Sequence, residues 1–178
     1  MKVIAGKYKG KKIDTINDLS TRPMLSVARE GIFNSLQFSF QNSEVLDLFA
    51  GSGSMGIEAL SRGAKYVTFI DNSSDCINQI KKNLKDYKED YSVINLDVSS
   101  YISETKISYD IIFYDPPFEY LSEKVDLDII ELSNNLKDEG FIVIHRHSNS
   151  PSTVLPKDVE LYKEKNYGQS KIFILRKL

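Results

Sequence analysis

The middle of the chain alternates short apolar runs with longer stretches in which apolar residues recur at helical spacing. Short apolar runs bounded by polar or turn-forming residues are typical of buried strands. The expected strands are Glu44–Phe49, Tyr66–Ile70, Ser92–Leu96, Asp110–Tyr114 and Phe141–Ile144. The expected helices between them are Gly56–Ser61, Ser74–Tyr87 and Tyr120–Leu136, the last closed by Lys137–Gly140 with its glycine at the C′ position. Strands separated by helices predict βαβ units and a parallel sheet.

The carboxyl-terminal part departs from this alternation. Val159–Glu164 and Lys171–Leu175 both have a strand pattern, and only a turn region at 166–168 follows the first before the second begins. Because no helix fits between them, the two segments predict an antiparallel hairpin at the edge of the sheet. We therefore expect a Rossmann-like α/β fold with a mostly parallel sheet, unlike the common six-stranded dinucleotide-binding fold.

The amino-terminal segment has a different character. Val3–Ala5 and Lys11–Ile13 predict a short β-hairpin, and a helix is expected at Ser26–Phe38 after a polar loop. Residues 1–30 contain seven basic and three acidic side chains, a net charge of +4 in a chain whose net charge is −2. A basic arm on an acidic body suggests a phosphate-facing surface, although a solvated lysine-rich hairpin has the same composition. The candidate phosphate-binding residues are Lys7, Lys9, Lys11, Lys12 and Arg22.

Length and composition limit the class of protein. At 178 residues, with 41% hydrophobic and 27% charged residues, the chain is expected to form one domain, an α/β core at 24–178 preceded by the extension 1–23. No apolar stretch is long enough to span a bilayer, and the first residues do not resemble a signal peptide. One cysteine excludes an internal disulfide and fits the cytoplasm, and one cysteine with two histidines makes a metal site unexpected. We expect a monomer.

The segment Asp115-Pro116-Pro117-Phe118 is the most informative motif of the chain. It follows an apolar strand, and the prolines end that strand because they cannot donate to a sheet ladder. The resulting loop lies at the carboxyl end of a strand, where open α/β sheets bind ligands. A carboxylate and a backbone carbonyl can accept the two hydrogens of an exocyclic amine, and the phenylalanine ring can stack on its base. All four residues are therefore candidate catalytic residues.

A glycine-rich loop lies upstream, between an expected strand and an expected helix. Gly51, Gly53 and Gly56 match the G-x-G-x-x-G pattern, and Asp71 follows the first of them by 20 residues at the end of the next strand. Such a loop lets a ligand approach the backbone closely, and the acid can bind ribose hydroxyls. By itself, this pattern also fits NAD.

Asp47 separates the two interpretations because it interrupts an apolar strand, where an unpaired carboxylate is costly. The ammonium group of S-adenosylmethionine would pair with it, directly or through water, whereas NAD would bring a pyrophosphate to this loop. The methionine carboxylate can use N–H groups of the glycine loop and helix start. Asp97, at the end of a third strand, can accept from the adenine amine or simply cap that strand. The candidate cofactor site comprises Asp47, Phe49, Gly51, Gly53, Asp71, Asp97, Val98 and Asp115.

Almost the whole chain resembles the bacterial RsmD-type methyltransferases, a family of class I S-adenosylmethionine-dependent enzymes. The segments that carry the resemblance are Val3–Ile13, Thr21–Pro23, Arg29–Asn34, Leu46–Gly53, Glu58–Ala64 and Asp115–Phe118. The opening hairpin and the Thr-Arg-Pro helix start are more specific to the family than the glycine loop. The resemblance implies a seven-stranded sheet and methylation of a guanine N2 amine in 16S ribosomal RNA, within an assembling or assembled small ribosomal subunit.

The chain departs from the family pattern at two places. Met24–Val27 replace the small polar residues, acid and base that usually follow Thr-Arg-Pro. The fifth strand often ends in an acid, but here it ends in His145–His147, whose two histidines we expect at the surface or in a loop, without a catalytic role. Cys76, inside an expected helix and far from any ligand-binding loop, is interpreted as a core or inert surface residue.

Three other functions fit parts of the pattern. An N6-adenine methyltransferase acting on DNA or RNA would use the Asp-Pro-Pro-Phe loop equally well. A dinucleotide-dependent oxidoreductase would use the glycine loop, but neither Asp47 nor the terminal hairpin favours it. A non-catalytic RNA-binding module with the same fold would bind RNA without methyl transfer.

Overall fold

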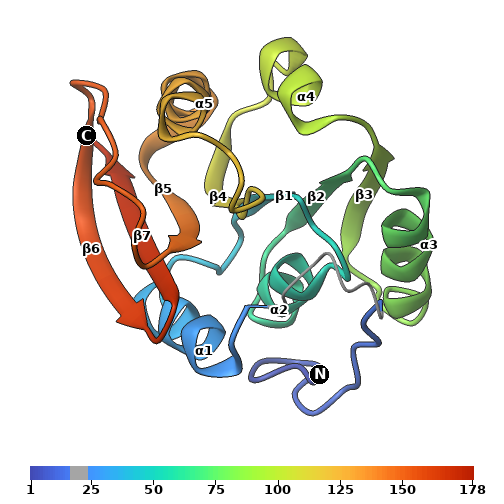
Figure 1. Ribbon diagram of the computed structural model, residues 1–178. Coiled ribbons are helices and arrows are strands. Elements are labelled where there is room, and N and C mark those ends of the chain that lie inside the picture. Colours follow the sequence, from blue (N-terminus) through green and yellow to red (C-terminus); the bar gives the residue numbers. More distant parts are fainter. Residues whose placement is uncertain (17–23) are drawn as a thin grey trace.

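The computed structural model describes residues 1–16 and 24–178 and contains one seven-stranded sheet (Figure 1). The strands are β1 (Glu44–Leu48), β2 (Tyr66–Asp71), β3 (Asp90–Asn95), β4 (Tyr109–Tyr114), β5 (Leu136–His147), β6 (Val159–Tyr167) and β7 (Ser170–Lys177). The helices are α1 (Ser26–Ser35), α2 (Ser54–Ser61), α3 (Ser74–Asn83), α4 (Val98–Glu104) and α5 (Ser122–Asn134).

The strand order is β3-β2-β1-β4-β5-β7-β6. The first five of these strands are parallel, and β7 is antiparallel to both β5 and β6. This arrangement confirms the predicted mostly parallel sheet, the antiparallel terminal hairpin and the number of strands that the family resemblance implied. The order reverses between β1 and β4, so the carboxyl ends of these strands form the topological switch point at which such sheets bind ligands.

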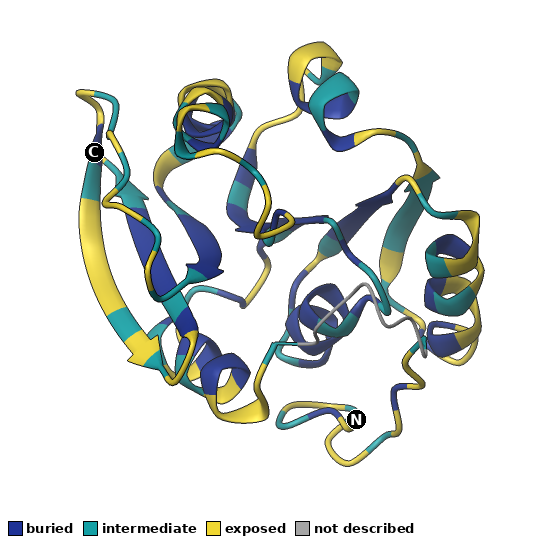
Figure 2. Ribbon diagram, in the orientation of Figure 1, coloured by how far each residue is buried: buried dark blue, intermediate teal, exposed yellow. Residues whose placement is uncertain are grey.

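Each face of the sheet has its own apolar core. Residues of α1, α2 and α3 pack with the amino-terminal extension on one face, and residues of α4 and α5 pack on the other. The central strands are buried on both faces, whereas the outward sides of the helices and much of β6 are exposed (Figure 2). Burial on both faces explains why β1, β2 and β4 are mostly apolar in the sequence.

Helix α3 shows how local sequence sets the ends of an element. Ser73 is its N-cap, and the serine side chain accepts a hydrogen bond from the Cys76 N–H. Asp75 lies in the first turn, and Lys81 and Lys82 lie in the last, in the favourable orientation to the helix dipole. The helix ends at Asn83, four residues before the predicted end.

The largest deviation from the sequence prediction is at β5. The strand begins at Leu136, so Lys137–Gly140 belong to it and do not close α5, which ends at Asn134. Lys137 forms ion pairs with Glu44 of β1 at 3.0 Å and with Asp110 of the neighbouring strand β4 at 2.9 Å. Tertiary contacts thus extend a strand through a segment that the local pattern assigned to a helix end.

Helix α4, of seven residues, was not predicted, and α1 ends three residues before Phe38.

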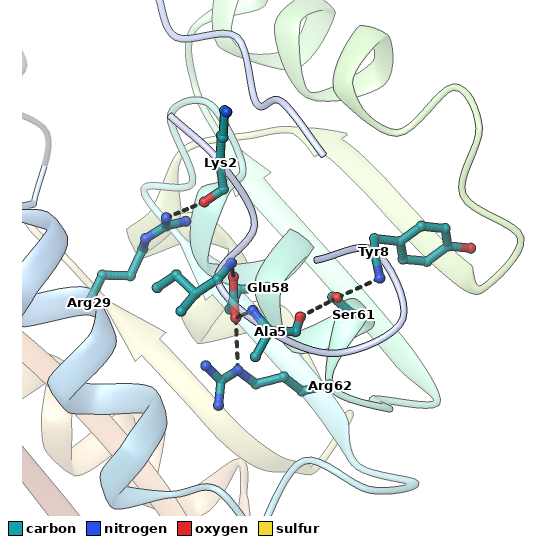
Figure 3. Close-up of polar contacts among 8 residues, drawn as sticks. Lys2, Ala5, Tyr8, Arg29, Glu58, Ser61 and Arg62 are labelled. Atoms are coloured by element: carbon teal, nitrogen blue, oxygen red, sulfur yellow. Dashed lines mark hydrogen bonds and ion pairs between the residues drawn. The ribbon is translucent and has the colours of Figure 1, made fainter. Parts of the chain in front are cut away.

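The predicted amino-terminal hairpin is present as a compact loop, with a single antiparallel bridge between Lys2 and Lys12. Its backbone is held by buried side chains of α2 (Figure 3). Glu58, fully buried, accepts the N–H groups of Ile4 at 2.7 Å and Ala5 at 3.0 Å. Ser61 accepts the Tyr8 N–H at 3.0 Å and donates to the Ala5 carbonyl at 2.6 Å. The extension is therefore docked on α2 by two buried polar side chains.

Two further contacts complete this docking. Arg29 of α1 is buried and donates to the Lys2 carbonyl at 2.5 Å, and burial lowers the pKa of its guanidinium. The Tyr8 ring packs on Tyr87, with 4.1 Å between ring centroids.

None of the described helices is long and apolar enough to cross a membrane. Within the same residues, no cluster of three or more His, Cys, Asp or Glu side chains is arranged to hold a metal ion.

Candidate active site

A cavity of about 680 Å³ opens at the switch point between β1 and β4. The glycine loop after β1, the end of β2, the start of α3 and the Asp-Pro-Pro-Phe loop after β4 contribute to its wall. The predicted site residues that line it are Asp47, Phe49, Gly51, Asp71, Asp115, Pro116, Pro117 and Phe118. The structure therefore brings together both motifs that the sequence singled out, although about 65 residues separate them in the chain.

The glycine loop has a backbone that ordinary residues rarely adopt. Phe49, Gly51 and Gly53 have φ values of 56°, 56° and 77°. Glycine takes such values without steric cost, whereas Phe49 stores strain of the kind that gathers at ligand sites. Asp71 holds the loop in place, because its carboxylate accepts the N–H groups of Gly51 and Ser73, both at 2.9 Å.

Asp47 is the most perturbed acid of the cavity. Burial raises the pKa of its carboxyl to about 8, the Gly56 N–H at 2.8 Å partly opposes this shift, and the nearby carboxylates of Asp115 and Asp71 add to it. Three carboxyl groups thus surround one space, and a cation placed among them would relieve their repulsion. The site fits a ligand that brings an ammonium group to Asp47.

The start of α2 can receive an anion beside this cation site. Ser54 and Met55 are its first residues and line the cavity, and their N–H groups have no acceptor within the described part of the chain. Helix N-termini favour negative charge. Gly56 must be a glycine, because a Cβ there would lie 2.3 Å from the Phe69 ring. The loop therefore offers a carboxylate and two free N–H groups to a zwitterionic ligand.

In the Asp-Pro-Pro-Phe loop, Asp115 is held by His145, near the end of β5. Its Oδ1 lies 2.8 Å from Nδ1 of His145, and 35% of the Asp115 side chain is exposed. Phe118 is 38% exposed and presents its ring edge-on to His145 and His147, at centroid distances of 5.2 and 5.8 Å. A carboxylate and an accessible ring therefore face the same cavity.

The predicted surface or loop position was wrong for His145, which lies within β5 and is 3% exposed, whereas His147, the last residue of the strand, is only partly buried. Arg146, between the two histidines, is 4% exposed. Arg146 donates to the carbonyls of Pro117 at 3.2 Å and Tyr120 at 2.6 Å, so it clamps the loop after β4. The His145 and Arg146 side chains can be buried because oxygens of the loop after β4 accept their hydrogen bonds, and this loop lies almost 30 residues earlier in the chain.

Below the loop, Tyr114 closes β4 as a fully buried side chain. Its hydroxyl donates to Asp128 of α5 at 2.5 Å, and burial, followed by that carboxylate, raises the pKa of the phenol. Asp128 also pairs with Lys124 one turn earlier in the helix. The last residue before Asp115 is thus fixed to α5, which limits movement of the loop.

Comparisons with known proteins agree with this site. A family model described as Conserved hypothetical protein 95 matches residues 1–176. Ribosomal RNA small subunit methyltransferase D of Haemophilus influenzae is 35% identical over 173 residues, which cover 94% of this chain and 89% of that protein. The chain belongs to the RsmD family of methyltransferases.

Two further comparisons support this membership. YlbH of Bacillus subtilis, a proposed rRNA methyltransferase, is 34% identical over 99% of both chains. The solved structure of yhhF from Escherichia coli, a proposed methyltransferase, has a TM-score of 0.86 at 30% identity and covers 99% of this chain and 97% of that one. The fold is that of a class I methyltransferase, and S-adenosylmethionine is the cofactor that such a methyltransferase requires.

Some predicted site residues of this methyltransferase lie outside the cavity wall. Gly53 shapes the loop but does not line the cavity, and neither do Asp97 and Val98. Asp97 is the N-cap of α4, where it accepts the Ser100 N–H at 3.1 Å, and Val98 is buried against the core. Arg22 lies outside the residues that the structure describes.

The predicted phosphate-binding lysines belong to the docked extension, and three of them are paired. Lys7 contacts Glu89 at 2.6 Å, Lys11 contacts Asp86 at 3.4 Å, and Lys12 contacts Asp14 at 2.6 Å. Lys9 has no ion pair with any described residue.

The sequence did not identify several cavity-lining residues. The amino-terminal segment and the residues just before α1 reach the cavity through Met1, Thr15, Ile16 and Met24, and the start of α3 reaches it through Ser73, Asp75 and Cys76. Cys76 therefore lies close to the ligand-binding loops, whereas the sequence pattern had placed it far from them. The N-cap pattern after Asp71 could have placed the start of α3 here, whereas no local signal marks the amino-terminal residues.

Proposed function

We propose that this methyltransferase transfers a methyl group from S-adenosylmethionine to the exocyclic N2 amine of a guanine in 16S ribosomal RNA. The observation that carries the proposal is the convergence of Asp47, Asp71 and Asp115 with the Asp-Pro-Pro-Phe loop around one cavity. The names of the H. influenzae and B. subtilis relatives support ribosomal RNA as the substrate class. The substrate would be an assembling or assembled small ribosomal subunit, and the enzyme would act as a cytoplasmic monomer.

The chemistry of the cavity matches the parts of the cofactor. Asp47 would pair with the ammonium group, the Ser54 and Met55 N–H groups would meet the carboxylate, and Asp71 would accept from ribose hydroxyls. Asp97 would accept from the adenine amine if its cap contact with Ser100 is exchanged. When bound, the cofactor supplies an electrophilic methyl group, so no covalent enzyme intermediate is required.

The residues of the loop after β4 would position the acceptor amine. Its lone pair is delocalised into the base, and Asp115 and the Pro116 carbonyl would accept its hydrogens so that the lone pair points toward the methyl group. Phe118 would stack on a base that has been turned out of its helix. Catalysis then depends on orientation and electrostatics and needs no metal.

The product identifies the acceptor amine. Small subunits from a deletion strain are incubated with the enzyme and radiolabelled S-adenosylmethionine, and the rRNA is digested for nucleoside mass spectrometry. We expect N2-methylguanosine at one position. Labelled N6-methyladenosine would favour the adenine alternative, binding without transfer would favour the RNA-binding module, and binding of NAD in place of S-adenosylmethionine would favour the oxidoreductase.

Cofactor binding should depend on pH through Asp47. In the protein without cofactor, the Asp47 carboxyl has a pKa of about 8 and is therefore protonated at pH 6. It must lose this proton to pair with an ammonium group. Affinity for S-adenosylmethionine should therefore rise about tenfold between pH 6 and pH 7, with proton release on binding. Calorimetry in two buffers of different ionisation enthalpy measures both quantities.

Two variants provide the controls for this prediction. Asp47→Asn keeps an acceptor for the Gly56 N–H but has no proton to release, so its affinity should be weaker and independent of pH over this range. Asp71→Ala should weaken binding roughly 10- to 100-fold and leave the pH dependence in place. An Asp47→Asn variant with the affinity and pH dependence of the parent would remove Asp47 from the cofactor site.

The amino-terminal lysines should contribute to rRNA binding but not to cofactor binding. Phosphate contacts position a nucleic acid, and each lost contact lowers the slope of log affinity against log salt by about one. Replacing Lys9, Lys11 and Lys12 by glutamine should weaken binding of rRNA and flatten its salt dependence. Because Lys11 and Lys12 are already paired with acids, Lys9→Gln should weaken rRNA binding more than either of the other two substitutions alone.

Lys163→Gln is the matched control for this set, since Lys163 is exposed on β6, at the opposite edge of the sheet from β3. It should bind rRNA like the parent. If the triple variant also binds rRNA like the parent at several salt concentrations, the extension is a solvated hairpin and another surface binds the RNA.

A further inference from the structure

The end of β5 places one buried imidazole between two polar partners at the edge of the active-site cavity. His145 Nδ1 lies 2.8 Å from Asp115 Oδ1, and His145 Nε2 lies 2.9 Å from the Ser170 hydroxyl of β7. His145 is 3% exposed, and its two partners come from the loop after β4 and from β7. Both ring nitrogens are therefore occupied, and the orientation of the ring is fixed.

The chemistry of the three groups determines where the protons lie. A carboxylate can only accept hydrogen bonds, so the contact with Asp115 requires a proton on His145 Nδ1. In the neutral ring, Nε2 is then an acceptor, and the Ser170 hydroxyl can donate to it. Ser170 thereby favours the tautomer that Asp115 needs.

This contact leaves Asp115 with a definite free acceptor. With Oδ1 occupied by His145, Oδ2 is the carboxylate oxygen left for a substrate amine. The Phe118 ring is held edge-on against the same imidazole, so one side chain contacts both residues of the loop that would face the base. A small rotation of the Asp115 carboxylate would misplace the amine, and misplacement of about 1 Å can cost roughly 100-fold in rate.

We infer that His145 is a positioning residue for methyl transfer, which orients the Asp115 carboxylate through Nδ1–H and is itself held in that tautomer by Ser170. The inference rests on the proposed function, since Asp115 must be the group that holds the substrate amine. His145 acts through Asp115 and needs no contact with the substrate or the methyl donor.

Two near-isosteric variants separate the two contacts of the ring. In His145→Asn the amide nitrogen can take the place of Nδ1 and donate to Asp115, whereas in His145→Gln the amide reaches the place of Nε2, next to Ser170. We expect His145→Gln to lower kcat roughly 100-fold. His145→Asn should retain at least about ten times more activity than His145→Gln. The affinity for S-adenosylmethionine should stay within about twofold of the parent in both.

Nitrogen NMR of the imidazole tests the same arrangement without substrate or turnover. The chain has only two histidines, so a His147→Gln variant leaves the His145 ring as the single imidazole signal. The proton should be on Nδ1 in that variant, and Ser170→Ala should shift the ring toward a mixture of tautomers. Circular dichroism and a melting curve confirm that each variant is folded.

The outcomes distinguish this inference from the proposed function. If the parent methylates no rRNA, the proposed function fails, and the NMR result still reports on the tautomer. If the proton lies on Nε2, or if the asparagine and glutamine variants have equal kcat, His145 does not position Asp115 and the inference is overturned. Retention of the Nδ1 proton together with partial rescue by asparagine supports it.

Discussion

Asp115→Ala is expected to lower kcat for rRNA methylation roughly 100- to 1000-fold, the range seen when one preorganised polar group is removed from an active site. The residue provides a carboxylate at the cavity edge that is fixed by His145 at 2.8 Å, and no other acid of the loop is held in this way. Binding of S-adenosylmethionine should change little. Asp115 also helps to raise the pKa of Asp47, so its removal makes ionised Asp47 easier to form.

Tritiated methyl transfer under single-turnover conditions, alongside a cofactor titration, measures both effects. Glu119→Ala is the control, because Glu119 is an exposed carboxylate of the same loop that also lines the cavity. The control should retain most activity. Near-normal transfer by Asp115→Ala, or an equal loss in both variants, would show that the position of this carboxylate is unimportant.

Gly6→Ala should detach the amino-terminal extension from α2, whereas Gly10→Ala should not. Both glycines have φ near +84°, so alanine costs about 1–2 kcal/mol of backbone strain at either position. Only at Gly6 would the new Cβ clash, at 1.8 Å from the backbone oxygen of Ser61, and no atom of residues 1–16 or 24–178 lies within 4 Å of a Cβ at Gly10. Gly6→Ala should therefore be less stable than Gly10→Ala by a further amount of about 1–3 kcal/mol.

Chemical denaturation compares the two variants directly, and hydrogen exchange at the Ile4 and Ala5 amides locates the change. These amides donate to the fully buried Glu58, so they should lose protection in Gly6→Ala only. rRNA binding should fall in the same variant if the extension positions the substrate. Equal stabilities and equal exchange in the two variants would mean that the contact with Ser61 does not hold the extension.

The sequence by itself determined the succession of strands and helices along the α/β core and the location of the site at the strand ends. β1, β2 and β4 could be predicted because parallel strands covered on both faces are mostly apolar. The glycine loop and the Asp-Pro-Pro-Phe segment could be placed at strand ends for local reasons, namely the special φ values of glycine and the missing N–H of proline. Asp47 was informative because an acid inside an apolar strand needs a partner.

Only the tertiary structure decided which elements extend beyond their local pattern. Lys137–Gly140 resemble a helix end, but Lys137 pairs with acids on β1 and β4, and the segment continues β5. Helix α4 has seven residues, too few for a periodic signal, and its stability comes from packing Val98, Tyr101 and Ile102 against the core.

The tertiary structure also decided the environment of individual charged groups. His145 and Arg146 have the composition of a surface strand end, yet they are buried, because Asp115, Ser170 and the backbone of the loop after β4 satisfy their hydrogen bonds. The basic character of the extension was visible in the sequence, but its ion pairs with Asp86 and Glu89 were not. In each case the partner is at least 25 residues away in the chain, so no local pattern could reveal it, and only the folded arrangement of the strands creates the contact.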